Sequence, residues 1–207
     1  MKPVKPTVIA VTSGLLLALA MAFGVTTRGK TGQFAAVTRP LKVRRRGSTV
    51  IVTLAPAVLD AVHRYFPGFA TPRFSDLDPD VLASGAEDPK PWVPFAAVAD
   101  FDGNRLPDIA LLLKNRRNRW LSVALHQMPR GVFRPYRLNA WQEENPKVDV
   151  DIRVLPAGYA SFPFSFTGGE FHGFNIPHPG IIEEIPGEAG RLHYFKGGRY
   201  HHVLFSW

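Results

Sequence analysis

Short hydrophobic runs separated by turn residues dominate the chain from residue 92 onward. Each run has the length of a strand, and the turn residues between them are those that join strands. The runs are Pro94–Ala99, Ile109–Leu113, Trp120–His126, Phe133–Leu138, Val148–Leu155, Arg191–Phe195 and Tyr200–Phe205. Gly197-Gly198, between the last two runs, is a strong signal for a two-residue hairpin turn. The pattern therefore predicts a mostly antiparallel sheet built of hairpins.

One segment before these runs has the spacing of a helix instead. Within residues 55–66, apolar positions recur on one helical face at Val58, Leu59, Val62, Tyr65 and Phe66. Pro56 suits the first turn of this helix, and Pro67-Gly68 ends it. Ser48–Leu54 alternates as a strand, and Thr71–Pro91 has the composition of a long loop with one helical turn near Pro79–Ala83. The predicted fold class is α+β, mostly β: an antiparallel sheet packed by one main helix.

The N-terminus carries a long uncharged run, Val8–Val25, preceded by Lys2 and Lys5. This arrangement is typical of a signal peptide or a signal anchor, and it predicts an N-terminal apolar helix. We assign residues 1–27 to this segment, with the cleaved and the anchored forms both open. The remainder is then expected outside the cytoplasm, either secreted or periplasmic, or held at the membrane. Basic residues after the run resist translocation, so insertion in the opposite direction, with a cytoplasmic domain, is the alternative.

Positive charge is concentrated near the N-terminus. Residues 1–46 contain nine of the 25 Lys and Arg residues and no acidic residue, so 16 basic residues face all 17 acidic ones in the remainder. The sequence predicts a basic linker, residues 28–47, that contacts anionic lipid headgroups through Arg44-Arg45-Arg46. The nearly neutral single domain that follows, residues 48–207, is not expected to bind nucleic acid. The chain has no cysteine, which excludes disulfides and thiolate metal sites.

The clearest candidate for chemistry is the turn between the first two hydrophobic runs, residues 100–108. Its oxygen-bearing side chains stand at relative positions 1, 3, 5 and 9: Asp100, Asp102, Asn104 and Asp108. Ca²⁺ takes roughly six to eight oxygen ligands at about 2.3–2.6 Å, and tight loops supply them by alternating side chains with a backbone carbonyl. Here Asp100, Asp102 and Asn104 would give one oxygen each, the Leu106 carbonyl another, and Asp108 would close the shell. The turn therefore predicts a calcium site.

This turn and its flanking strands, residues 92–126, resemble the FG-GAP/VCBS repeat, the calcium-binding hairpin of integrin-alpha-type β-propellers. The match is Asp-Phe-Asp-Gly-Asn-Arg-Leu-Pro-Asp followed by an apolar strand. The resemblance implies that Asp100, Asp102, Asn104 and Asp108 are calcium ligands. Arg105 departs from the usual Gly, at a position that favours a positive φ. An EF-hand is disfavoured, and a single copy of the motif cannot build a propeller of four to eight blades.

Two other interpretations of the sequence remain open. Turns rich in Asp, Asn and Gly also occur without metal, because these side chains bond their own backbone. A second group, Glu170, His172 and His178, contains ligands suited to zinc, although its spacing matches no known hydrolase motif. The main prediction is a non-enzymatic, calcium-supported module that binds a protein or glycan partner at the cell envelope. The alternative is a metal-dependent envelope hydrolase that uses Glu170, His172 and His178.

Overall fold

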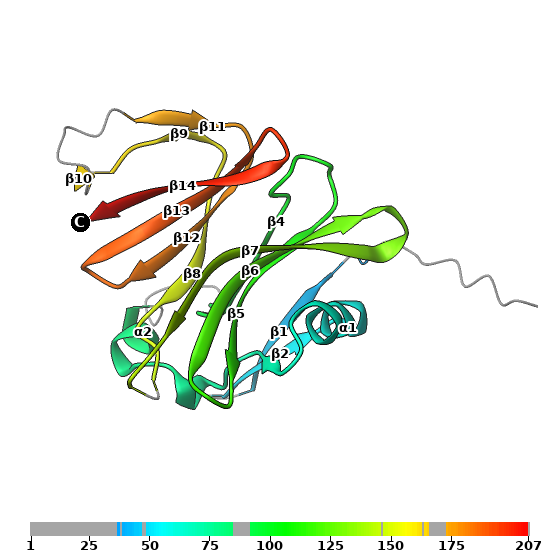
Figure 1. Ribbon diagram of the computed structural model, residues 1–207, viewed down its shortest axis with the longest axis vertical. Helices are drawn as coiled ribbons and strands as arrows, with labels where there is room; N and C mark the ends of the chain where they lie inside the picture. The colour runs from blue at the N-terminus through cyan, green and yellow to red at the C-terminus, as the bar shows by residue number, and fades with distance from the viewer. Residues whose placement is uncertain are drawn as a thin grey trace, which may run out of the picture. The chain divides into compact units, whose positions relative to one another are not determined.

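The computed structural model of the chain describes residues 37, 39–46, 49–84, 92–145, 147–162, 164–165 and 173–206 (Figure 1). The chain divides into two units, Met1–Gly32 and Gln33–Trp207, and every described residue belongs to the second. The predicted N-terminal apolar helix lies outside the described residues. Among the residues that are described, no helix is both long and apolar enough to cross a membrane.

The first five-stranded sheet contains the candidate loop. Its members are β3 (Phe69–Ala70), β4 (Ala96–Ala99), β5 (Asp108–Asn115), β6 (Arg119–Met128) and β7 (Val132–Gln142). The order is β3-β5-β6-β7, and β4 also pairs with β5. All of these pairings are antiparallel, as hairpins require. The sequence prediction of consecutive hairpins is confirmed for this sheet.

A second five-stranded sheet is formed by later residues. It contains β8 (Asp151–Leu155), β10 (Phe164–Ser165), β12 (Gly180–Ile185), β13 (Ala189–Lys196) and β14 (Arg199–Ser206), in the order β10-β14-β13-β12-β8. The predicted hairpin at Gly197-Gly198 is confirmed: Lys196 pairs with Arg199, and both glycines have positive φ. Two short strands, β9 (Gly158–Ala160) and β11 (Phe174–Ile176), pair separately. The sequence predicted one sheet, whereas the described residues form several.

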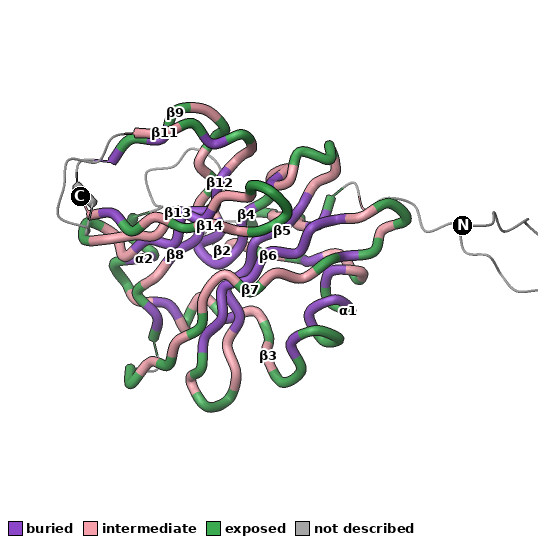
Figure 2. Tube along the Cα trace, turned by 45° about the horizontal axis from the view of Figure 1, so that its top comes forward, coloured by how far each residue is buried: buried purple, intermediate pink, exposed green. Residues whose placement is uncertain are grey.

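The two larger sheets pack face to face through β6. Every residue from Trp120 to Gln127 is buried, so both faces of this strand are covered. Ser122 contacts Glu183 of β12, and His126 contacts Tyr200 of β14. Because side chains alternate along a strand, Val123 and Leu125 point to the opposite face. Figure 2 shows the buried positions, in purple, concentrated along β5 and β6.

A helix and a hairpin cover that opposite face. Figure 1 shows β5, β6 and β7 between β12–β14 on one side and α1, β1 and β2 on the other. The helix α1 (Pro56–Tyr65) has Pro in its first turn and buries Ala61 with the predicted Val58 and Val62, whereas Leu59 and Tyr65, predicted on the same face, are exposed. A second, shorter helix, α2 (Pro79–Ser84), occupies the position where one helical turn was predicted. The main helix of the sequence prediction is thus confirmed.

The basic linker was predicted too long. Leu41–Arg46 form strand β1, which pairs along its whole length with β2 (Thr49–Leu54). Leu41 and Val43 are half-buried against the core, while Lys42 and the three arginines are exposed. Alternation of apolar and basic residues over Leu41–Arg44 is a strand pattern that the high charge concealed. The folded domain therefore begins before residue 48.

Candidate functional site

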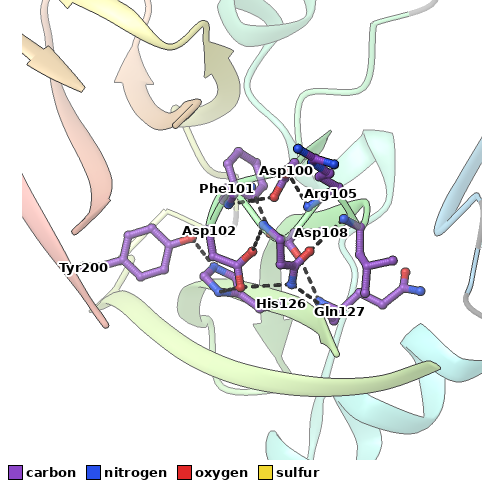
Figure 3. Close-up of polar contacts among 11 residues, drawn as sticks. Asp100, Phe101, Asp102, Arg105, Asp108, His126, Gln127 and Tyr200 are labelled. Carbon is purple, nitrogen blue, oxygen red and sulfur yellow. Dashed lines mark hydrogen bonds and ion pairs between the residues drawn. The ribbon is translucent and has the colours of Figure 1, made fainter. Parts of the chain in front are cut away.

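The loop between β4 and β5 closes where the sequence places it. Ala99 pairs with Asp108, so residues 100–107 form the connection of an antiparallel hairpin. Asp108 is fully buried, and each of its carboxylate oxygens accepts a backbone N–H: Oδ2 from Phe101 at 2.9 Å and Oδ1 from Gln127 at 2.7 Å. Figure 3 shows this carboxylate between the loop and strand β6. Asp108 therefore ties the two ends of the loop to the sheet.

Side chains of the loop also bond its own backbone. Asp100 accepts N–H groups from Gly103 and Arg105, both at 2.8 Å, and Asn104 accepts one from Leu106 at 2.7 Å. Arg105 has φ 66° and Gly103 has φ 79°, so the chain turns through two left-handed residues. The expectation that the Arg105 position favours a positive φ is confirmed. These bonds hold the loop closed and bring Asp102 toward the sheet.

A histidine of β6 joins two of the predicted ligands. Asp102, Asp108 and His126 each offer one ligand atom, and these atoms all lie within 4.8 Å of one another. His126 Nδ1 lies 3.3 Å from Asp102 Oδ2, and both side chains are visible together in Figure 3. Asp102 also accepts a bond from the Asn104 amide at 3.1 Å. Of the residues predicted as ligands, Asp102 and Asp108 converge, whereas Asp100 is outside this three-residue group.

His126 was not identified from the sequence, although register could have indicated it. Ile109 pairs with Leu125, so the residue before Ile109 lies beside the residue after Leu125. The short turn after Asn115 sets this register, and His126 follows in the next strand of the same hairpin. The number of residues in the turn between β5 and β6 decides that His126, and not a neighbouring residue of β6, lies beside Asp108.

Burial dominates the electrostatics of the cluster. Burial raises the pKa of Asp108 to about 7; the N–H bond from Gln127 opposes the rise, and the charge of Asp102 adds to it. The same effect lowers the pKa of His126 to about 4, because a charged imidazole loses its hydration there. Burial also raises the pKa of Tyr200 above its ordinary value. Near pH 6 these two shifts favour a protonated Asp108 and a neutral His126.

Aromatic side chains of β7, in the same sheet, and of β13 and β14, in the second sheet, surround the imidazole of His126. Its ring centroid lies 4.5 Å from Tyr136, 4.7 Å from Phe195 and 5.4 Å from Tyr200. His126 Nε2 and the Tyr200 hydroxyl are hydrogen bonded at 2.7 Å, the contact drawn at the left of Figure 3. The ring is 1% exposed, so it has little freedom to rotate. Its Nδ1 is thereby aimed at the loop.

The alternative metal site predicted from Glu170, His172 and His178 is only partly covered by the described residues. Glu170 and His172 lie outside them. His178 is described, and it packs on the candidate loop: a Cβ built on Gly103 would come within 2.2 Å of the His178 ring. A glycine is therefore required at position 103, both for its positive φ and for this close approach.

A second buried polar cluster lies between the sheets, away from the loop. Glu183 accepts hydrogen bonds from Ser122 and from the Asn139 amide, and His193 Nε2 lies 3.1 Å from its Oε1. Burial alone would raise the pKa of Glu183. The contacts with His193, Ser122 and Arg191 outweigh burial and lower this pKa below its ordinary value. This glutamate borders a cavity of about 230 Å³ that Trp141 and Leu204 also line.

No family model, no curated protein and no solved structure matches the chain. The resemblance of residues 92–126 to the FG-GAP/VCBS repeat therefore stays a prediction. What the described residues define is a mostly β domain with a closed acidic loop beside a buried histidine.

Proposed function

We propose that the chain is a non-enzymatic, exported or envelope-anchored module whose loop at residues 100–108 binds a divalent cation. Ca²⁺ is the ion expected from the oxygen donors of Asp100, Asp102, Asn104, Leu106 and Asp108. The cation would stiffen the hairpin and present the exposed turn to a protein or glycan partner. The apolar run at residues 8–25 and the basic residues after it would hold the module at the membrane.

One observation carries the proposal: the carboxylates of Asp102 and Asp108 converge although nothing cationic separates them. In the described part of the chain, no Lys or Arg forms an ion pair with either group. Burial is the main reason why the pKa of Asp108 is raised, and repulsion from the charge of Asp102 raises it further. A divalent cation between them would turn this repulsion into attraction. Export supports the choice of ion, because extracellular modules bind Ca²⁺ at about 10⁻⁴–10⁻³ M.

Thermal unfolding of the full-length chain, in EGTA and in 10 mM Ca²⁺, tests the proposal. At those affinities, binding to the native state alone stabilises it by about 1.4–2.7 kcal/mol. Asp102→Asn should abolish the calcium-dependent rise in the unfolding midpoint, since it removes a charged ligand without changing the shape. The matched control is Asp60→Asn, an exposed aspartate on α1, which should keep the full rise.

Two results would count against this proposal. If Ca²⁺ does not shift the midpoint of the wild-type chain, and other divalent ions do not either, the loop is a metal-free turn held by its own hydrogen bonds. If Asp102→Asn keeps the calcium-dependent rise as fully as Asp60→Asn does, the ion binds elsewhere on the surface.

A further inference from the structure

We infer that His126 is itself a metal ligand, so that this site accepts an ion that takes imidazole, such as Zn²⁺, more tightly than Ca²⁺. The inference rests on the proposed cation site and adds a nitrogen ligand to its oxygen donors. Ca²⁺ is coordinated by oxygen, whereas Zn²⁺ combines imidazole nitrogen with carboxylate oxygen. A donor set of two carboxylates and one imidazole is therefore better matched to zinc or a similar first-row ion.

The imidazole is placed as a ligand would be. His126 Nδ1 is buried and makes no hydrogen bond, although it points at the loop. The closest acidic atom is Asp102 Oδ2 at 3.3 Å. An unbonded buried nitrogen is costly unless something else satisfies it, and a metal ion bound to its lone pair would do so. The buried nitrogen without a hydrogen bond and the converging carboxylates of Asp102 and Asp108 both point to a cation as the ligand.

The separation of these atoms suits a small tetrahedral ion. Ligand atoms that each lie about 2.0–2.2 Å from such an ion are about 3.3–3.6 Å apart. The 3.3 Å between His126 Nδ1 and Asp102 Oδ2 has this value. Asp108 offers an oxygen within 4.8 Å of both, so a modest movement of one side chain would complete three ligands. The side chain of Asp102 is 15% exposed, which leaves a solvent-facing direction for a fourth.

Each of the three ligands also has an outer partner that fixes it. His126 Nε2 is hydrogen bonded to the Tyr200 hydroxyl, and Asp102 accepts a hydrogen bond from the Asn104 side-chain amide. Both oxygens of Asp108 accept hydrogen bonds from backbone N–H groups. Ligating histidines almost always bond through their second ring nitrogen in this way, and ligating carboxylates are likewise hydrogen bonded. Tyr200 is thus a positioning residue, which orients Nδ1 toward the ion. Only the modest movement of one side chain separates this arrangement from a complete set of three ligands.

The experiment is calorimetric titration of the full-length, chelator-treated chain with Zn²⁺ and, separately, with Ca²⁺. We expect one Zn²⁺ per chain, with an affinity at least tenfold above that for Ca²⁺. His126→Gln should weaken Zn²⁺ binding by about a hundredfold and change Ca²⁺ binding by less than threefold. His202→Gln is the matched control, because it removes an exposed histidine of β14 that could bind zinc adventitiously.

A second measurement does not depend on any variant folding. Zinc-edge X-ray absorption of the loaded wild-type chain should show the multiple scattering of one imidazole. Its absence, or unchanged Zn²⁺ affinity in His126→Gln, would overturn the inference. Binding of Ca²⁺ without Zn²⁺ would overturn it too and would leave the proposed function standing. If neither ion binds, the proposed function falls together with the inference.

Discussion

Unfolding free energy as a function of pH should reveal an exchange of one proton between two buried groups. In the folded chain the pKa of Asp108 rises from 3.8 to about 7, and that of His126 falls from 6.5 to about 4. Between about pH 4 and 6.5 the folded cluster holds its proton on Asp108, whereas the unfolded chain holds it on His126. The number of bound protons is then the same in both states, so the pair adds no slope to the stability curve.

Each group alone would give a slope, and the two slopes have opposite sign. A raised acid pKa contributes stability that is present below pH 3.8 and is lost as the pH rises through about 7. A lowered histidine pKa contributes stability that is present above pH 6.5 and is lost as the pH falls through about 4. One proton corresponds to about 1.4 kcal/mol per pH unit. The two contributions are thus of the order of 4 and 3 kcal/mol.

Urea denaturation in EDTA, followed by tryptophan fluorescence between pH 4 and 7, separates the two. Relative to wild type, Asp108→Asn should gain stability with rising pH, because it lacks the Asp108 contribution, which decreases as the pH rises. His126→Phe should lose stability with rising pH, since it keeps only the Asp108 contribution, which decreases as the pH rises. Both variants will be less stable overall, by about 1–3 kcal/mol for each hydrogen bond lost. Difference curves that are flat for either variant would show that the burial-driven shift is absent and would refute this account.

Two further predictions concern backbone strain and the second buried cluster. Arg105→Gly should raise the unfolding free energy by up to about 1 kcal/mol, because glycine adopts φ 66° without steric cost. The control is Arg117→Gly, in an exposed turn where φ is not positive, which should give no gain in the same urea titration. A lower unfolding free energy for Arg105→Gly than for wild type would contradict the prediction. Ser122→Ala should cost about 1–3 kcal/mol at neutral pH, because the buried Glu183 loses a donor. The exposed Ser75→Ala is the control, and equal costs for the two serines would mean that the Ser122 bond is not stabilising.

Local patterns in the sequence predicted much of the fold. The helix at Pro56–Tyr65, the hairpin around the candidate loop and the glycine turn before β14 all follow from spacing or from turn residues. Strand β12 was missed, because Ile181-Ile182-Glu183-Glu184 does not alternate. Both glutamates are buried, and the bonds that make their burial tolerable come from other strands. Pairing of this kind is tertiary and has no signature in a local window.

The candidate site was predicted to a similar extent. Spacing identified Asp102 and Asp108, since a loop that wraps a cation repeats oxygen donors along one segment. His126 is separated from that segment by a whole strand and a turn, and its orientation depends on Tyr200, 74 residues further along the chain. Whether a donor such as Asp100 turns toward an ion or bonds the backbone is decided by loop geometry. Composition does not encode that choice.

The contact between His126 and Tyr200 bears on how far this loop could be transplanted. Tyr200 belongs to β14, and the His178 ring that rests on Gly103 comes from the turn before β12. A fragment ending at Met128 would carry every acidic residue of the loop and the histidine, but neither of these supports. Grafting the nine loop residues onto another hairpin would move the sequence motif without its setting. Cation binding at this loop therefore depends on the two packed sheets together, and it would not be transferred with the loop sequence alone.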